Sequence, residues 1–132
     1  MECKYIKSLN NINSINDFED KVSYKFDKLF IDFVKENNGG RPLKKTFNTD
    51  KSEGRRIKSF LSFNQEDIES IWKVSEWNPQ ILEKGYVSIG ISDSGDLICF
   101  AKDNNGVVYF DLDEEMPEKV ADSFDAFLKA LY

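Results

Sequence analysis

The sequence predicts an α+β fold with a mixed, mostly antiparallel sheet of about five to six strands packed with helices. Three apolar or alternating segments, at residues 86–91, 96–102 and 107–112, are separated only by short turns. Turns of this length are typical of hairpins in an antiparallel sheet. The 132 residues include 40% apolar side chains and eleven Phe, which is enough to bury one core. We therefore expect a single domain over residues 1–132.

The first half of the chain predicts two helices. Residues 1–13 show no strong periodicity and are expected to be a loosely ordered lead-in. Asn13, Ser14 or Asn16 can cap a short helix over residues 15–22. A stronger helix follows. It is expected to end at Asn37-Asn38-Gly39-Gly40, because Gly can adopt the left-handed conformation that closes a helix. Its apolar stripe consists of Phe26, Leu29, Phe30, Phe33 and Val34.

The remaining elements alternate between strands and helices. Residues 43–48 and 55–63 are expected to form strands around a polar turn. Asn64 is a candidate cap for a helix with Ile68, Ile71 and Trp72 on its apolar side, ending near Trp77. A last helix is predicted to start near Pro117, a favourable first helical position. Its apolar stripe would contain Val120, Phe124, Phe127, Leu128 and Leu131.

The composition argues against most catalytic chemistry. There is no His, the commonest general base and a frequent zinc ligand. Cys3 and Cys99 are far apart in the sequence, and Cys99 lies in an apolar run typical of a buried residue. No apolar run approaches the ~18 residues of a membrane span, and the N-terminus lacks the core of a signal peptide. We expect a cytoplasmic protein without cofactor, metal or enzymatic activity.

Charge divides the chain unevenly. Residues 1–63 carry a net charge of +4 and residues 64–132 a net charge of −10. The C-terminal carboxylates cluster at the expected turns and predict either an acidic docking surface or only turn chemistry and solubility. Trp77, beside a Pro turn, is either an exposed interface anchor or partly buried. The candidate partner-binding residues are Trp77, Asp93, Asp96, Asp111, Asp113, Glu114 and Glu115.

Two other interpretations carry less weight. The acidic spacing does not match a calcium-binding EF-hand, and no pair of carboxylates is spaced as in a glycosidase-type hydrolase. The cations around Lys44, Lys45 and Arg55-Arg56 form a local basic patch, interleaved with Phe residues. Single-stranded nucleic acid could bind such a patch, but strand alternation makes those Phe residues core, and the net charge of −6 opposes a polyanion.

The order of these segments resembles the SUKH superfamily, and more narrowly its bacterial Smi/Knr-like branch. The resemblance covers about residues 15–132, and one departure is the absence of a Leu-Pro pair near residues 22–26. The resemblance rests on the order and spacing of the segments more than on any single motif. The matching stretches are Asn37-Asn38-Gly39-Gly40, the helix with Trp72, residues 85–90, 94–100 and 106–111, and Ser123-Phe124 with Phe127-Leu128.

This resemblance implies an α+β fold and a role in protein docking. Many bacterial members are immunity proteins that neutralise polymorphic toxins, often nucleases, and the family has no catalytic residues to carry over. A basic nuclease cleft would suit an acidic surface. The expectation is thus an immunity protein that binds a cognate toxin, without binding nucleic acid or membrane, as a monomer or weak dimer. The alternative is a scaffold or regulatory module of the Smi/Knr type without a toxin partner.

Overall fold

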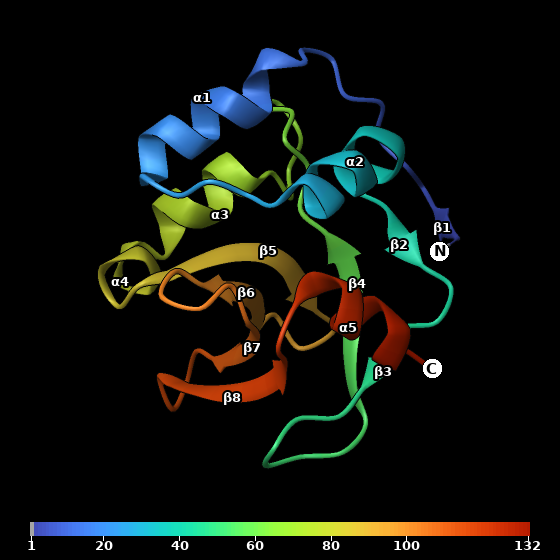
Figure 1. Cartoon of the computed structure of the whole chain (residues 1–132), viewed down its shortest axis with the longest axis vertical. Coiled ribbons are helices and arrows are strands. Elements are labelled where there is room, and N and C mark those ends of the chain that lie inside the picture. The colour runs from blue at the N-terminus through green and yellow to red at the C-terminus, as the bar shows by residue number, and fades with distance from the viewer. Residues whose placement is uncertain (1) are drawn as a thin grey trace.

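The computed structural model describes residues 2–132 and contains a six-stranded sheet with helices packed against it (Figure 1). The strands follow one another in chain order, β3-β4-β5-β6-β7-β8, and every ladder in this sheet is antiparallel. The predicted α+β fold is confirmed. The strands are β1 (Cys3–Lys4), β2 (Arg41–Pro42), β3 (Thr46–Phe47), β4 (Arg55–Phe60), β5 (Tyr86–Ser92), β6 (Leu97–Ala101), β7 (Val107–Asp111) and β8 (Met116–Ala121).

The helices pack against the sheet (Figure 1), and their apolar side chains join those of the strands in one core. Phe30 of α2 lies in the aromatic core. Its ring centroid is 5.1 Å from that of Phe100 in β6 and 4.9 Å from that of Phe124 in α5. All eleven Phe side chains are buried, and so is Cys99, as its apolar run predicts. The helices are α1 (Asn13–Val22), α2 (Lys28–Asn37), α3 (Ile71–Trp77), α4 (Pro79–Glu83) and α5 (Phe124–Ala130).

The sheet curls, so that the loop between β3 and β4 contacts β8 at the opposite edge. The amide of Asp50, in the β3–β4 loop, donates to the carbonyl of Lys119 in β8 at 2.9 Å, and the amide of Lys119 donates to the Asp50 carboxylate at 3.0 Å. Thr46 and Tyr132 exchange backbone hydrogen bonds of 3.0 and 2.9 Å, which fixes the end of the chain beside β3. These contacts hold the curled sheet around the aromatic core.

Residues 2–13, which the sequence suggests are loosely ordered, make specific contacts. Cys3 and Lys4 form a two-stranded antiparallel sheet with Arg41 and Pro42. Asn38, at the end of α2, donates its amide to the carbonyl of Lys7 at 2.8 Å and accepts the amide of Phe63 at 2.8 Å. Gly39 follows with a φ of 66°, the left-handed conformation expected at this helix end.

Two predicted helix starts are wrong. Residues 116–121 form β8 instead of the start of the last helix, because Pro117 sits in register with Phe110 and Glu118 points into the interior. The last helix begins after Ser123, whose hydroxyl accepts the amide of Ala126 at 3.1 Å. Val120 therefore lies on a strand and not on the helix stripe.

The helix predicted after Asn64 also begins later. Ser70 caps α3, and Ile68 is 79% exposed. Asn64 instead uses its side chain to bind the backbone of Asn10 and Ser8, which ties this loop to the N-terminal segment. A short helix, α4, follows α3 with Pro79 as its first residue.

The stripe predicted for α2 needs a smaller correction. Asp27 caps α2 by accepting the amide of Phe30 at 2.8 Å. Phe26 is therefore buried ahead of the helix rather than on it, and Leu29 is 43% exposed. Phe30, Phe33 and Val34 form the buried side of α2.

Candidate docking surface

All six predicted acidic residues lie at two neighbouring turns of the sheet. The turn between β5 and β6 carries Asp93 and Asp96, and the turn between β7 and β8 carries residues 111–115. The amide of Leu112 donates to Oδ1 of Asp96 at 3.0 Å, which joins the two turns directly. The meander brings these carboxylates together because both turns follow strands that run in the same direction.

Asp96 is occupied by the interior of the protein. Its Oδ2 accepts the hydroxyl of Tyr109 at 2.6 Å, and Tyr109 is only 1% exposed. Burial, together with the hydrogen bond to Asp96, raises the pKa of Tyr109 above its usual value. Asp96 thus shapes the turn and binds a buried phenol, and its carboxylate is little available to a partner.

Asp111 has a similar local task. Its Oδ1 accepts the amides of Asp113 and Glu114, at 2.9 and 3.1 Å. Side chains of Asp commonly stabilise turns in this way. The structure therefore supports the turn-chemistry interpretation for Asp96 and Asp111.

The last three carboxylates point into solvent. Asp113, Glu114 and Glu115 are all exposed. Glu115 adopts a φ of 52°, and its Oε2 lies 3.9 Å from the ammonium group of Lys84. We call Asp111–Glu115 the acidic turn, because it presents three exposed carboxylates on one short hairpin connection.

Asp93 belongs to a different electrostatic environment. Its carboxylate lies 3.4 Å from Nε of Arg56, and its amide donates to the carbonyl of Arg56. It also borders a hollow whose other walls include Lys4, Arg41 and Lys45. Asp93 therefore sits beside cations, apart from the acidic turn in its surroundings.

Trp77 is an exposed aromatic side chain on another element. It is the last residue of α3 and is 64% exposed. The side-chain amide of Asn78 donates to the carbonyl of Val74 at 2.9 Å at the end of the helix, after which Pro79 starts α4. Of the two sequence interpretations, exposure is the one that the structure shows. A large exposed aromatic is a typical interface anchor.

An ion pair between a partly buried arginine and a buried glutamate, on the inside of the curled sheet, was not predicted. Nη2 of Arg55 lies 2.8 Å from Oε2 of Glu118, whose other oxygen accepts the hydroxyl of Thr49 at 2.6 Å. The guanidinium also lies 4.3 Å from the ring centroid of Tyr109. Neighbouring side chains on a strand point to opposite faces. Two consecutive arginines on a strand, Arg55 and Arg56, therefore indicate that one of them points inward, where a carboxylate must neutralise it.

The described residues were also compared with the requirements of metal binding and of membrane crossing. Within residues 2–132 no group of three or more Cys, Asp or Glu side chains is arranged to bind a metal ion. In the same range, no helix has the length and apolar character that crossing a membrane requires. Cys99 is fully buried, and burial raises the pKa of its thiol to about 12.

Together these features define a helix-backed, curled antiparallel meander with an acidic turn and an exposed tryptophan. Compared with family profiles, residues 11–130 match the SMI1 / KNR4 family (SUKH-1). The chain belongs to this family, which agrees with the resemblance that the order of its segments indicated. A comparison of the sequence with curated proteins returns no match.

Proposed function

We propose that this chain is an immunity protein that binds a cognate bacterial polymorphic toxin and blocks it by stoichiometric docking. The membership of the SMI1 / KNR4 family carries this proposal, because the family's bacterial branch is expected to include many such proteins. The acidic turn supports a toxin of the nuclease type. A nuclease cleft must hold a phosphate backbone and is therefore basic, so exposed carboxylates can occupy it and speed its encounter.

The proposal gives the named residues different tasks. Asp113, Glu114 and Glu115 would face the toxin, while Asp96 and Asp111 would hold the turn in shape through their backbone hydrogen bonds. Trp77 would be an apolar anchor at the edge of the interface. No chemical step is required of this chain, which would act as an inhibitor in the cytoplasm and not as an enzyme.

The proposal expects a toxin gene beside this one, and the first experiment is co-expression with the toxin domain that such a gene encodes. The expected results are rescue of growth and co-purification as a complex of one chain of each. Failure of both would contradict the proposal and favour the scaffold or regulatory role.

A matched pair of variants tests the acidic turn. Changing Asp113→Asn, Glu114→Gln and Glu115→Gln should lower the association rate constant with the toxin by about tenfold at low salt. The difference should shrink at high salt, because ions screen exposed charges. The control changes Asp17→Asn, Asp20→Asn and Glu36→Gln on α1 and α2, which removes the same charge elsewhere. Equal effects from both triple variants would show that net charge, and not the acidic turn, guides binding.

A further inference from the structure

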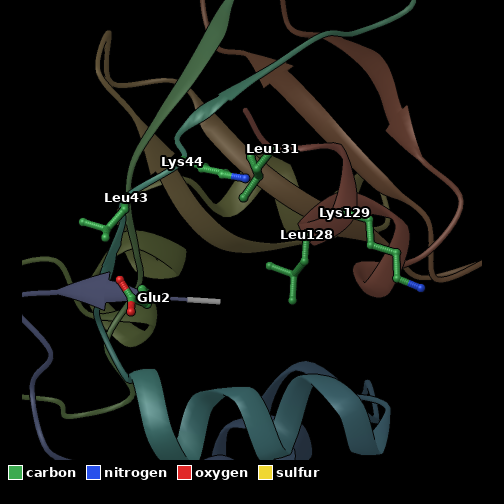
Figure 2. Close-up of a pocket in the computed structure, with 6 residues that line it drawn as sticks. All are labelled: Glu2, Leu43, Lys44, Leu128, Lys129 and Leu131. Atoms are coloured by element: carbon green, nitrogen blue, oxygen red, sulfur yellow. The ribbon is translucent and has the colours of Figure 1, made fainter.

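A second exposed surface surrounds Leu43, in the segment that connects β2 to β3. Leu43 is 47% exposed and is shared by two hollows. The larger, of about 540 Å³, is walled by Leu43, Leu128 and Leu131 together with the charged residues Glu2, Lys44 and Lys129. Figure 2 shows Leu43 on one side of this hollow and Leu128 of α5 on the other, with α2 running below them in the view. The smaller hollow, of about 330 Å³, shares Leu43 and is otherwise lined by different residues, among them Lys4, Arg41 and Asp93.

Four cations around Leu43 lack an internal partner. Lys4, Arg41, Lys44 and Lys45 are exposed, and no carboxylate of residues 2–132 lies within 4 Å of their charged nitrogens. All four line one of the two hollows. We call Leu43 and these four residues the Leu43 face. The two hollows are also lined by the carboxylates of Glu2 and Asp93, but six cations line them in all, so positive charge prevails here on a protein whose net charge is −6.

The geometry determines what kind of partner can satisfy this face. Carboxylates placed along the four cations would gain favourable electrostatic energy, and an aliphatic side chain could be buried against the three leucines. Nucleic acid would meet the cations but would leave the apolar hollow empty. Arg41, 5.2 Å from the ring centroid of Tyr5, covers one face of that ring, so at most one base could stack there. An anionic membrane would find Leu43 and Tyr5 as exposed apolar side chains of this face.

We propose that the Leu43 face docks an acidic segment of another protein, with Asp or Glu side chains along the cations and one aliphatic side chain in the leucine-lined hollow. This inference goes beyond the toxin proposal, because it concerns a surface of the opposite sign from the acidic turn. The basic patch identified in the sequence is divided between the interior and the surface. Arg55 points to Glu118 in the interior, whereas Lys44 and Lys45 remain on the surface.

Designed peptides test the proposal on the full chain. The probe is a fluorescein-labelled ten-residue peptide with four Glu and one central Leu in a Gly/Ser background. Fluorescence anisotropy should show saturable binding that weakens as salt rises. Replacing the Leu by Ser should weaken binding about fivefold, since the burial of one aliphatic side chain is lost. Replacing the four Glu by Gln should abolish it.

Protein variants then locate the binding surface. Lys44→Gln with Lys45→Gln should weaken the peptide at least tenfold, and Leu43→Ser should weaken it about fivefold. The matched control is Lys25→Gln with Lys28→Gln, which removes two cations whose side chains are 76% and 88% exposed. Circular dichroism confirms that each variant is folded. All substituted positions of the Leu43 face are exposed, so loss of binding can be assigned to the surface.

Several results would overturn this assignment. Absence of saturable binding would do so, as would equal effects from the control variant and the Lys44 and Lys45 variant. Tighter binding of a single-stranded oligonucleotide, or of phosphatidylserine vesicles, would assign the face to those ligands. Self-association that the same substitutions abolish would assign it to a second copy. Toxin rescue by the Leu43 variants is scored separately, so failure here does not imply failure of the proposed function.

Discussion

The pair of Arg55 and Glu118 joins two strands that are far apart in the chain. Glu118 is 7% exposed, and its two carboxylate oxygens bind Arg55 and Thr49. A buried ion pair adds little net stability against an apolar pair, but loss of one partner leaves the other charge poorly compensated. Arg55, whose side chain is 27% exposed, would keep only part of its hydration. This asymmetry makes Glu118 more sensitive to substitution than the many exposed carboxylates near it.

We therefore predict that Glu118→Gln lowers the free energy of unfolding by about 2 kcal/mol. The amide can still accept from Thr49 but no longer neutralises Arg55. Urea denaturation followed by circular dichroism measures the effect. The neighbouring Lys119→Gln provides the control, because its side chain is 67% exposed and should change stability by less than about 0.5 kcal/mol. Equal stabilities of the two variants would contradict the prediction.

The helix starts show which local signals the sequence carries. Gly39 and the stripe of α2 predicted that helix well, because they act within a few residues. Pro117 misled the prediction of α5, since a proline suits a first helical turn as well as a strand position without an amide donor. Only the pairing with Phe110, which depends on the curl of the whole sheet, selects the strand.

The contrast between local signals and long-range contacts also explains which features of the candidate docking surface could be predicted. The sequence placed the carboxylates of the acidic turn after the strand at residues 107–112, but it did not predict the hairpin turn that they form ahead of β8. It could not separate Asp96, which binds the buried Tyr109, from the exposed Asp113. It also could not anticipate that Asp93 would lie beside Arg56, because that contact joins β4 to the β5–β6 turn.

At the scale of one helix, we predict that Ser123→Ala lowers the free energy of unfolding by about 1 kcal/mol. The substitution removes the hydroxyl that accepts the amide of Ala126 and leaves that amide without its cap. Ser123→Asp should retain nearly full stability, because its carboxylate can accept the same hydrogen bond. Thermal unfolding of the two variants makes the comparison. A loss with Asp as large as with Ala would show that Ser123 does not act as the cap.

At the scale of the whole molecule, several buried groups hold their protons more tightly when folded. Burial raises the pKa of Tyr24 and of Cys99 to about 12, and that of Cys3 to about 11. A pKa raised by folding stabilises the folded state below the unfolded pKa, and this contribution is lost as pH rises towards the folded value. The loss should therefore begin near pH 8.5, about where unfolded thiols ionise, and continue as unfolded phenols ionise near pH 10.

We accordingly predict that the urea midpoint stays constant from pH 7 to about pH 8.5 and falls as pH rises further to 10.5. A variant with Cys3→Ser and Cys99→Val should lose less stability over the same range, because its thiols cannot ionise. Urea titrations at fixed ionic strength measure both proteins. A midpoint independent of pH up to 10.5 would contradict the assignment of these groups to the interior.

The order of the strands has a consequence for the kinetics of folding. From β5 to β8 each strand pairs with the strand next to it in the chain, through connections of a few residues. Such short loops close with little loss of entropy, and local pairing is associated with fast folding. We expect this hairpin series to form early, with substitutions in β6 and β7 slowing refolding. The Asp50–Lys119 contacts span most of the sheet and should form after it, so their loss would mainly accelerate unfolding.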